Sequence, residues 1–319
     1  MIVILGSGIA GLSLSYFLSS SGIKNLVIEK EDFVGKKRDT SLISKKIERF
    51  FELENFVEKE HKIANFYYKD ELAFSVKSKN KMVVINRNSF EKYIFENIDK
   101  NFSKFSFNTF AKGLKNNLVI TNKGNFEFEI LVDALGPYSL LNKNKKIAIG
   151  IEAIVKGKIM ENVNIFFDNN FSKNYFGWIV DVNNYTKIGL MDYNLKLKTF
   201  WNFLKKFNLK EVKEFYAYPI NTSIAKKLCN KNYLIVGEAS GYIKPFSLGG
   251  ITFSVFSAFL AYKYIKRGEI EKYEKAMKKV FWKSIKIGKI LKRLFHTFNI
   301  KVFKPLAPLA KFLDPDFLY

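Results

Sequence analysis

The sequence is short of the residues that build disulfide frameworks and metal centres. It has one cysteine, Cys229, and two histidines, His61 and His296, in 319 residues. A single cysteine excludes a disulfide scaffold, a CxxC redox pair and a zinc ribbon. The two histidines lie far apart in the chain, so we expect no metal site. Cys229 itself is interpreted as a small, inert apolar residue.

Long uniformly apolar segments are also missing. The uncharged segment from Pro245 to Tyr262 contains several serines and glycines, and falls short of the about 20 residues that span a bilayer. We therefore predict a buried helix there rather than a membrane span. No basic segment precedes the first apolar residues, and glycines begin at Gly6, so a signal peptide is not expected. These features predict a cytoplasmic protein, with peripheral attachment to the inner membrane face as an option.

Acidic residues are scarce relative to basic ones. The chain has 53 Lys and Arg against 30 Asp and Glu, a net charge of +23. Such an excess indicates an anionic partner: nucleic acid, an acidic membrane face, or an acidic ligand or electron donor. The basic residues are nearly all lysine, which also fits an AT-biased genome or life at high temperature. Because 48% of the residues are apolar, the chain can build a core, which excludes a disordered polyelectrolyte.

The N-terminal segment has the pattern of a dinucleotide-binding turn. An apolar strand at 2–5 leads into GSGIAG at 6–11, and a helix and a second strand at 25–28 follow. In this GxGxxG pattern the first glycine allows the tight turn, the second lets a pyrophosphate approach the backbone, and the third lets the helix pack closely. Glu29 ends the second strand, where a carboxylate binds ribose hydroxyls. The motif predicts a dinucleotide site but does not choose between FAD and NAD.

Two later segments have the form of strands that end at a ligand. Residues 131–139, LVDALGPYS, give a short strand and a glycine–proline turn. Residues 234–251, LIVGEASGYIKPFSLGGI, give a buried strand that ends at Gly237 and Glu238, and then a glycine pair before a long apolar helix. Glycines allow a ligand to approach the backbone closely, and a helix N-terminus favours an anion. Both segments therefore indicate ligand contacts.

Together the three motifs resemble those of the FAD-dependent geranylgeranyl reductase family, within the larger group of hydroxylase-type flavoproteins. The family's second motif, VDAxGPxS, is matched at 132–139. Its third motif, VGDAAGxxxPxxGGGI, is similar to VGEASGYIKPFSLGGI at 236–251. The family pattern RxxF[DE]xx[LI] is matched from Arg87 to Ile94. The resemblance extends from residue 1 to about residue 265 and implies FAD as the cofactor.

The resemblance also implies which residues hold FAD. The turn glycines would hold the pyrophosphate, Glu29 the adenosine ribose, and Arg87 would lie near the ribityl-phosphate side. Glu238 replaces the family's aspartate and would bond a ribityl hydroxyl. The helix after the glycine pair would favour anionic reduced flavin with its positive end. The implied cofactor-binding residues are Gly6, Gly8, Ile9, Ala10, Gly11, Glu29, Lys30, Arg87, Gly237, Glu238, Gly249, Gly250 and Ile251.

The order of α/β and β-rich segments predicts two interleaved domains. The predicted fold class is α/β, with a Rossmann-like FAD-binding domain interleaved with a mixed or antiparallel β-sheet substrate domain, plus C-terminal helices. The predicted boundaries are 1–46, 84–146 and 228–265 for the FAD-binding domain, 47–83 and 147–227 for the substrate domain, and 266–319 for a basic C-terminal helical region.

Local patterns predict particular elements within these domains. Residues 47–62 mix charged residues with Phe and Leu, which indicates a helix. Residues 66–85 alternate in polarity and are expected to form two or three antiparallel strands. Residues 89–98 are expected to form a short amphipathic helix, with Ser89 as its N-cap.

The substrate side of the resemblance is weaker than the cofactor side. The family has an aromatic strand, YxWxFP, over its pocket. Residues 174–181, NYFGWIVD, give a degraded version that implies Tyr175 and Trp178 as substrate-binding residues. Many members carry a Cys-Gly-Gly segment, and the matching stretch at 38–44 has no cysteine. The catalytic residues are therefore unknown, and the candidate proton donors are Thr40, Ser41, Tyr175 and Lys244.

Residues 263–319 carry a net charge of +10 and are expected to be helical from Glu271 onward. On a helical projection the basic residues Lys283, Lys286, Lys289 and Arg293 oppose the apolar residues Phe281, Ile287, Leu291, Leu294, Phe295 and Phe298. This pattern is typical of a helix on an anionic membrane surface. It is equally typical of a helix packed on its own core with a solvated basic face. Residues 303–319 contain three prolines and are expected to be irregular.

The function implied by the resemblance is that of an FAD-dependent oxidoreductase. It would saturate isoprenoid double bonds of a geranylgeranyl lipid, or of an archaeal-type phospholipid precursor, by hydride transfer from reduced flavin. Its partners would be this lipid, an electron donor (reduced nicotinamide, deazaflavin or ferredoxin) and an anionic membrane surface. The first alternative is a hydroxylase-type flavin monooxygenase. The second, a nucleic-acid-binding flavoprotein, is not expected because the sequence has no recognisable RNA or DNA module.

Overall fold

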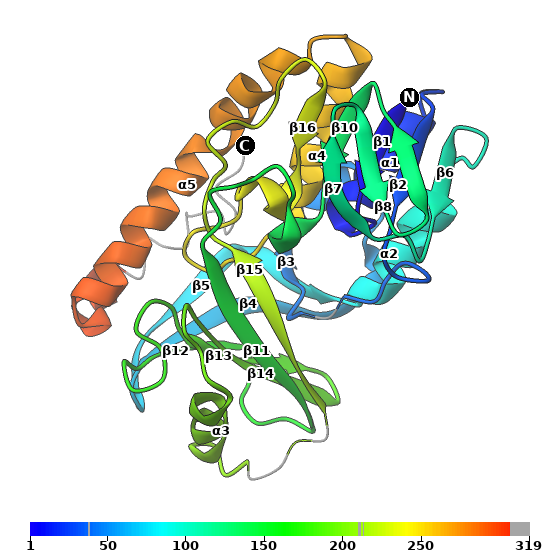
Figure 1. Cartoon of the computed structure of the whole chain (residues 1–319). Helices are drawn as coiled ribbons and strands as arrows, with labels where there is room; N and C mark the ends of the chain where they lie inside the picture. The colour runs from blue at the N-terminus through cyan, green and yellow to red at the C-terminus, as the bar shows by residue number, and fades with distance from the viewer. Residues whose placement is uncertain (38, 210–211, 213, 307–319) are drawn as a thin grey trace.

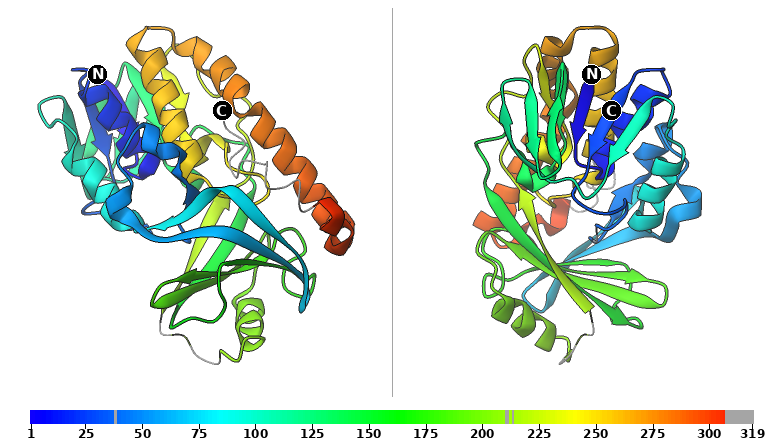
Figure 2. Two further views of the ribbon diagram at one scale, coloured as in Figure 1. Left: turned by 180° about the vertical axis from the view of Figure 1, so that it is seen from behind. Right: turned by 45° about the vertical axis from the view of Figure 1, so that its right-hand side comes forward.

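The computed structural model describes residues 1–37, 39–209, 212 and 214–306. It has a parallel sheet with helices against it, a larger curled sheet, and a long helix along the outside (Figures 1 and 2). Arg38, the first residue of the stretch compared with the Cys-Gly-Gly segment, lies outside the described residues. The same holds for 307–319, the end of the basic C-terminal region.

The first sheet carries the three motifs on neighbouring strands. Its order is β16-β10-β1-β2-β6, and every neighbouring pair is parallel. In this order the strands are Tyr233–Ile235, Ile130–Asp133, Ile2–Leu5, Asn25–Ile28 and Ser103–Ser106. Parallel strands end at the same edge of a sheet, so the segments that follow β1, β10 and β16 meet there.

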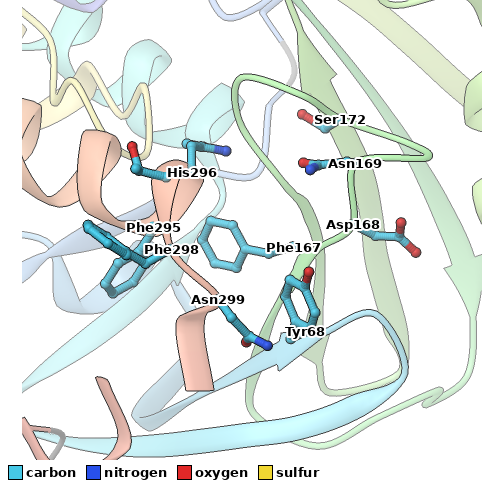
Figure 3. Close-up of a pocket in the computed structure, with 10 residues that line it drawn as sticks. Tyr68, Phe167, Asp168, Asn169, Ser172, Phe295, His296, Phe298 and Asn299 are labelled. Atoms are coloured by element: carbon cyan, nitrogen blue, oxygen red, sulfur yellow. The ribbon is translucent and has the colours of Figure 1, made fainter. Parts of the chain in front are cut away.

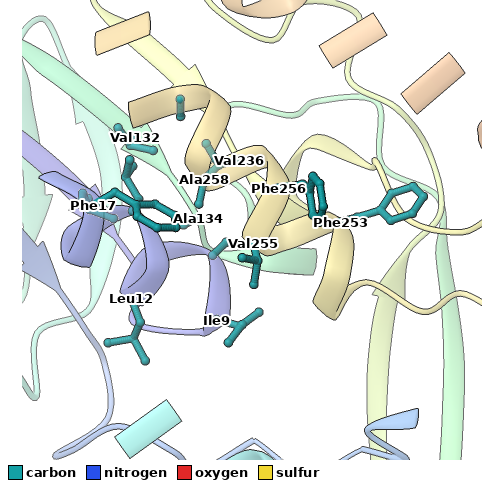
Figure 4. Packing of buried hydrophobic residues seen from close by; sticks show 14 of the residues in the cluster. Ile9, Leu12, Phe17, Val132, Ala134, Val236, Phe253, Val255, Phe256 and Ala258 are labelled. Atoms are coloured by element: carbon teal, nitrogen blue, oxygen red, sulfur yellow. The ribbon is translucent and has the colours of Figure 1, made fainter. Parts of the chain in front are cut away.

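Two helices cover the first sheet and pack against each other. α1 (Ile9–Ser19) follows β1, and α4 (Ile251–Lys266) follows the third motif. Their buried side chains face one another (Figure 4). Phe17 of α1 meets Phe259 of α4 with ring centroids 5.5 Å apart. The helix predicted from Gly250 is therefore confirmed, with Gly250 as its N-cap.

The second sheet has eight strands in the order β15-β11-β14-β13-β12-β4-β5-β3, and only β12 and β4 are parallel neighbours. In this order the strands are Glu214–Asn221, Ile147–Lys156, Tyr185–Asp192, Gly177–Val182, Val163–Phe167, Val57–Tyr68, Glu71–Ile85 and Leu42–Ser44. α3 (Leu197–Lys205) packs on one face of this sheet (Figure 1). The two sheets and the C-terminal helices confirm the predicted fold class. β3 belongs to this sheet although its residues fall in the segment assigned to the FAD-binding domain.

Smaller elements complete the described part of the chain. The strands β7 (Ala111–Lys115), β8 (Leu118–Thr121) and β9 (Gly124–Glu127) form a small antiparallel sheet. The short 3-10 helices are η1 (Lys45–Arg49), η2 (Glu54–Phe56), η3 (Gly136–Tyr138), η4 (Gly237–Ser240), η5 (Ile270–Lys272) and η6 (Ile300–Leu306).

The helix predicted for residues 47–62 is wrong. This segment contains η2 and then β4, which pairs with β5 on one side and with β12 on the other. Backbone hydrogen bonds to two distant strands outweigh the weak local periodicity. The charged residues that suggested a helix are tied across the strands instead, since Glu60 forms ion pairs with Lys45 and Lys81. The antiparallel strands predicted at 66–85 are confirmed as part of the β4–β5 hairpin.

The helix predicted at 89–98 begins and ends earlier, as α2 (Arg87–Glu96). Its N-cap is Asn86 rather than Ser89, because the Asn86 side chain accepts a hydrogen bond of 3.0 Å from the Ser89 backbone N–H. The shift matters because it places Arg87 in the first turn of the helix.

As far as residue 306, the C-terminal region is helical, as predicted. α5 (Tyr273–Thr297) is the longest helix among the described elements, and η6 follows it. The irregular structure predicted for 303–319 is therefore wrong as far as residue 306, because η6 continues through Pro305. Within the described ranges we find no helix that combines the length and the apolar character needed to cross a bilayer.

Candidate cofactor and substrate site

The structure brings the three motifs together at the carboxyl edge of the first sheet. A Cβ atom on Gly6 would lie 2.9 Å from the carbonyl oxygen of Ala134, which belongs to the second motif. A Cβ atom on Gly237 of the third motif would lie 2.7 Å from the Cβ of Ala10. These approaches are closer than side-chain contacts allow. The glycines therefore let three separate segments of the chain converge on one site.

The GxGxxG turn has the geometry that its glycines predict. Gly6 has a φ of +94°, which only glycine adopts readily. A Cβ on Gly11 would lie 1.9 Å from the Gly6 carbonyl oxygen, so the helix could not approach the turn with any other residue there. Gly8, in contrast, faces open space, because a Cβ there would meet nothing within 4 Å. This open position is where a pyrophosphate would meet the backbone.

Glu29 directly follows β2, and its carboxylate stabilises the glycine turn after β1. One carboxylate oxygen of Glu29 accepts hydrogen bonds from the Ser7 backbone N–H at 2.6 Å and from the Ser7 hydroxyl at 2.8 Å. The other oxygen accepts from the Glu31 N–H at 3.0 Å. A carboxylate has about four acceptor positions, so Glu29 keeps capacity for a ribose hydroxyl. Lys30, beside it, is exposed and pairs with Glu31.

The third motif leads into α4, so a second helix begins at the same site. Gly249 and Gly250 precede α4, and Gly250 gives the helix no side-chain cap. The hydroxyl of Thr252, in the first turn, is buried and has no hydrogen-bond partner. Glu238 accepts a hydrogen bond of 2.9 Å from the Asn221 N–H, which ties the motif to the end of β15. Burial raises the pKa of the Glu238 carboxyl.

These features fit FAD. Two helices, α1 and α4, begin at the site with uncapped N–H groups and no acidic residue in the first turn. Uncapped helix N-termini carry partial positive charge and bind phosphate or anionic rings. The open position at Gly8 gives the pyrophosphate access, and the orphaned Thr252 hydroxyl offers a hydrogen bond. The cofactor-binding role of each single residue stays a prediction, because the structure places the residues but not the ligand.

Arg87 lies in an ion-pair network rather than at an open surface. It is 9% exposed, its Nε donates to Glu91 at 2.8 Å, and its Nη1 pairs with Asp39. Burial disfavours the Asp39 carboxylate, but the Arg87 guanidinium outweighs this and holds the Asp39 pKa below its usual value. Arg87 therefore fixes the segment after β2, next to the glycine turns.

A buried carboxyl that sequence reasoning missed lies on the facing sheet. Glu152 in β11 has no exposed surface, and it accepts hydrogen bonds from the Trp178 indole N–H at 2.8 Å and from the Thr40 hydroxyl. Burial raises the pKa of the Glu152 carboxyl to about 7, and its second oxygen has no hydrogen-bond partner. The Lys187 ammonium lies nearby and donates to the Thr40 carbonyl at 3.1 Å. A lone acid inside the apolar strand IAIGIEAIV was the available signal.

The two predicted substrate residues lie on the sheet face that meets the third motif. Trp178 and Tyr175 share one buried apolar cluster with Ile243 and Leu248, which precede α4. The Tyr175 hydroxyl donates to the Tyr193 hydroxyl at 3.1 Å, away from Glu152. Among the candidate proton donors, Thr40 donates a hydrogen bond directly to Glu152. Glu152 therefore joins the second sheet, through Trp178, to the segment that follows β2, through Thr40.

A cavity of about 110 Å³ lies elsewhere, between the end of α5 and the ends of β4 and β12 (Figure 3). Its lining includes Tyr68, Phe167, Phe295 and Phe298. An apolar cavity of about 150 Å³ holds one benzene ring, so this one is too small for a prenyl chain. A second recess, of about 450 Å³, is polar and lies beside Cys229, before β16. Neither is lined by the glycine motifs.

Comparison with known proteins agrees with this geometry. A family model described as an NAD(P)-binding Rossmann-like domain matches residues 4–40. An uncharacterized protein of Methanocaldococcus jannaschii is 27% identical over 92% of this chain and 84% of its own length. A digeranylgeranylglycerophospholipid reductase of Methanococcus vannielii is 24% identical over 82% of this chain and 75% of its own. A digeranylgeranylglycerophospholipid reductase of M. jannaschii is 26% identical, also over 82% of this chain and 75% of its own length.

Solved structures show the same fold. A geranylgeranyl bacteriochlorophyll reductase-like protein of Thermoplasma acidophilum has a TM-score of 0.82 and 17% identity, covering 100% of this chain and 93% of its own. PqsL of Pseudomonas aeruginosa, described as a probable FAD-dependent monooxygenase, has a TM-score of 0.73 and 13% identity, covering 96% and 98%. At these identities the likeness concerns the fold alone.

Proposed function

Since the chain is an FAD-dependent oxidoreductase of the geranylgeranyl reductase type, we propose that it saturates isoprenoid double bonds of a geranylgeranyl lipid or its precursor. The observation that carries this proposal is the similarity to two digeranylgeranylglycerophospholipid reductases, which extends over 82% of the chain. It therefore includes the second sheet as well as the cofactor motifs.

The chain's own residues would position the two reactants. The uncapped N-termini of α1 and α4 would hold the cofactor by its charged groups. Bound FAD, once reduced, supplies the hydride that an alkene accepts. The apolar cluster around Trp178 would receive the isoprenoid and exclude water from it. Such positioning contributes because an isolated alkene has no charge by which it can be oriented.

Saturation of an alkene also needs a proton, and Glu152 is suited to hold one. Its raised pKa keeps a substantial fraction of the carboxyl protonated near neutral pH. The Thr40 hydroxyl donates to Glu152 and extends this group by one hydrogen bond, next to Asp39, which pairs with Arg87. We infer that Glu152 and Thr40 hold the proton that the second alkene carbon receives. Because residues 38–44 contain no cysteine, the proposed proton donor in this chain is a carboxyl instead.

The test is a single-turnover reaction. The FAD-loaded protein is reduced with dithionite without oxygen, mixed with a geranylgeranyl glycerolipid in detergent, and the lipid is weighed by mass spectrometry. We expect a gain of one hydrogen pair per double bond, and none with oxidised flavin. An unchanged lipid, with flavin bound and reduced, would contradict the proposal.

The competing function is that of a hydroxylase-type monooxygenase. The likeness in fold to PqsL is the observation that favours it. The two functions differ in the reaction of reduced flavin with oxygen. A reductase should transfer its electrons to the lipid faster than to oxygen, whereas a monooxygenase should consume oxygen when its substrate binds. Stopped-flow reoxidation with and without lipid separates them.

A further inference from the structure

The outer side of α5 and η6 carries an unusual group of exposed apolar side chains. Trp282 is 51% exposed, Ile290 48%, Phe298 54% and Val302 59%. α5 runs along the outside of the molecule, on the side away from β6 (Figures 1 and 2). Single exposed apolar residues are ordinary, but four within 21 positions of one segment are a patch that indicates a contact surface.

Apart from Phe298, this patch is not part of the apolar face that the helical pattern predicted. The inner side of α5 is packed on the chain's own core, with Phe281 fully buried against Phe253 at a centroid distance of 4.7 Å. Gly288 comes so close to Pro245 that a Cβ would lie 2.7 Å from its ring. Internal packing therefore accounts for the buried face, as the second interpretation of the pattern required. It leaves the exposed Trp282 and Ile290 without an explanation.

The charges that α5 and η6 carry beyond residue 274 are all of one sign, and one of them, Lys301, forms an ion pair with Glu71 of β5. Residues 275–306 contain ten Lys and Arg and no Asp or Glu. Lys279, Lys286, Lys289 and Arg293 are exposed and follow the three- and four-residue spacing of one helix side, the side of Trp282 and Ile290. The Lys286 ammonium lies 5.8 Å from the centroid of the Trp282 ring. A helix side that mixes exposed lysines with Trp and Ile matches the headgroup region of an anionic bilayer.

We propose that the outer side of α5 and η6 docks on an anionic lipid bilayer. The surface consists of Lys279, Trp282, Lys286, Lys289, Ile290, Arg293, Phe298 and Val302. The lysines supply attraction to anionic headgroups, and the apolar side chains enter the interface. Docking would place the protein where a lipid substrate is found, but the surface argument does not depend on the proposed function.

The docking surface adjoins the cavity at the end of α5. Phe298 belongs both to the docking surface and to the lining of the 110 Å³ cavity (Figure 3). Phe295 and Phe167 also line the cavity and pack on each other, with ring centroids 5.6 Å apart, within the cluster that also contains Trp178. The docking surface is therefore continuous with the aromatic cluster of the second sheet, although the cavity between them is too small to admit a prenyl chain.

The first experiment measures binding of the FAD-loaded full chain to vesicles. Vesicles of equal parts phosphatidylglycerol and phosphatidylcholine are compared with phosphatidylcholine alone, by co-sedimentation. We expect binding to the anionic vesicles only, weakened by salt. The triple variant K279E/K286E/R293E should bind at least about a hundredfold more weakly. The matched control K104E/K112E/K115E, with the same change of net charge on β6 and β7, should bind like the parent.

Equal loss in both triple variants would overturn the proposal, because it would mean that net charge alone attracts the vesicles. Equal binding to neutral vesicles, or competition by RNA that removes all vesicle binding, would overturn it too. Failure of docking with intact reduction of detergent-dispersed lipid would leave the proposed function standing. Docking without reduction would leave the docking surface standing and reject the function.

A second measurement follows Trp282 itself. Trp178 is buried and Trp201 is half-buried, so Trp282 is the most exposed of the three tryptophans. Adding anionic vesicles should shift the emission to shorter wavelength, and brominated lipid should quench it. The W282F variant should lose both effects, while W201F should keep them. An unchanged response in W282F would contradict the assigned surface.

Discussion

At the residue scale, the glycines of the first turn differ in what they do. Gly11 is required for the close approach of α1 to the turn, whereas Gly8 leaves space that no protein atom fills. Sequence alone treats both as parts of one motif. The structure separates a glycine that serves folding from one that serves ligand access, and this separation can be tested.

We predict that Gly8→Ala and Gly11→Ala fail in different ways. Gly8→Ala should change the free energy of unfolding of the FAD-free protein by less than about 1 kcal/mol, but reduce FAD retention strongly. Gly11→Ala should lower stability itself, because its Cβ would overlap the Gly6 carbonyl. Urea unfolding of the FAD-free proteins, with flavin absorbance of the purified ones, provides both readouts. Equal stability of the two variants would contradict this division.

Glu152 is the second residue for which the structure supplies what sequence could not. Its folded pKa of about 7 exceeds the ordinary value of 4.5, so the folded state keeps a proton that the unfolded state loses. This contribution to stability is fully present below about pH 4.5 and is lost as the pH rises toward 7. Glu152→Gln should remove that loss, which amounts to about 3 kcal/mol.

The check is urea unfolding of the parent and Glu152→Gln at pH 5 and pH 8. The stability of the variant relative to the parent should rise between the two values. Glu127→Gln, at an exposed position in β9, is the control and should leave the pH dependence unchanged. Parallel pH profiles for the parent and Glu152→Gln would mean that Glu152 titrates normally in the folded protein.

At the element scale, the position of α5 is fixed by the packing of its inner side. Gly288 lies against Pro245, the proline of the third motif, so the helix is tied to the segment that leads into α4. Gly288→Ala should therefore lower the melting temperature, although alanine favours a helix by about 1 kcal/mol over glycine. Lys289→Ala, one position further and exposed, serves as the control with no backbone clash. A higher melting temperature for Gly288→Ala would show that α5 can move away from Pro245 at no cost.

At the scale of the whole molecule, the net charge of +23 acts on stability as well as on partners. Self-repulsion among like charges destabilises a compact state, and salt screens it over a Debye length of about 10 Å at 0.1 M. We predict that the melting temperature rises by several degrees between 10 mM and 0.3 M sodium chloride. Differential scanning calorimetry provides the measurement, and a fall with salt would mean that attractive surface pairs dominate.

Much of the cofactor side was predictable because its constraints are local. Positive φ at Gly6 and Gly237, and the close approach of Gly11 to Gly6, demand glycine at set distances from a strand end, and this spacing is visible in the sequence. Helices α1 and α4 follow from the same motifs. The family resemblance rests on these segments, and the strand order of the first sheet places them side by side.

The remainder depended on contacts between distant residues. The segment after residue 47 became strand β4 because β5 and β12 supply its backbone hydrogen bonds, which no local window contains. Glu152 meets Thr40 and Trp178 only through the folded sheet, so its raised pKa has no local signature. By itself the sequence determined the fold class and the cofactor turns, since glycine conformation is a local property. Tertiary structure alone decided the buried carboxyl and the exposed side of α5, since burial depends on what the rest of the chain covers.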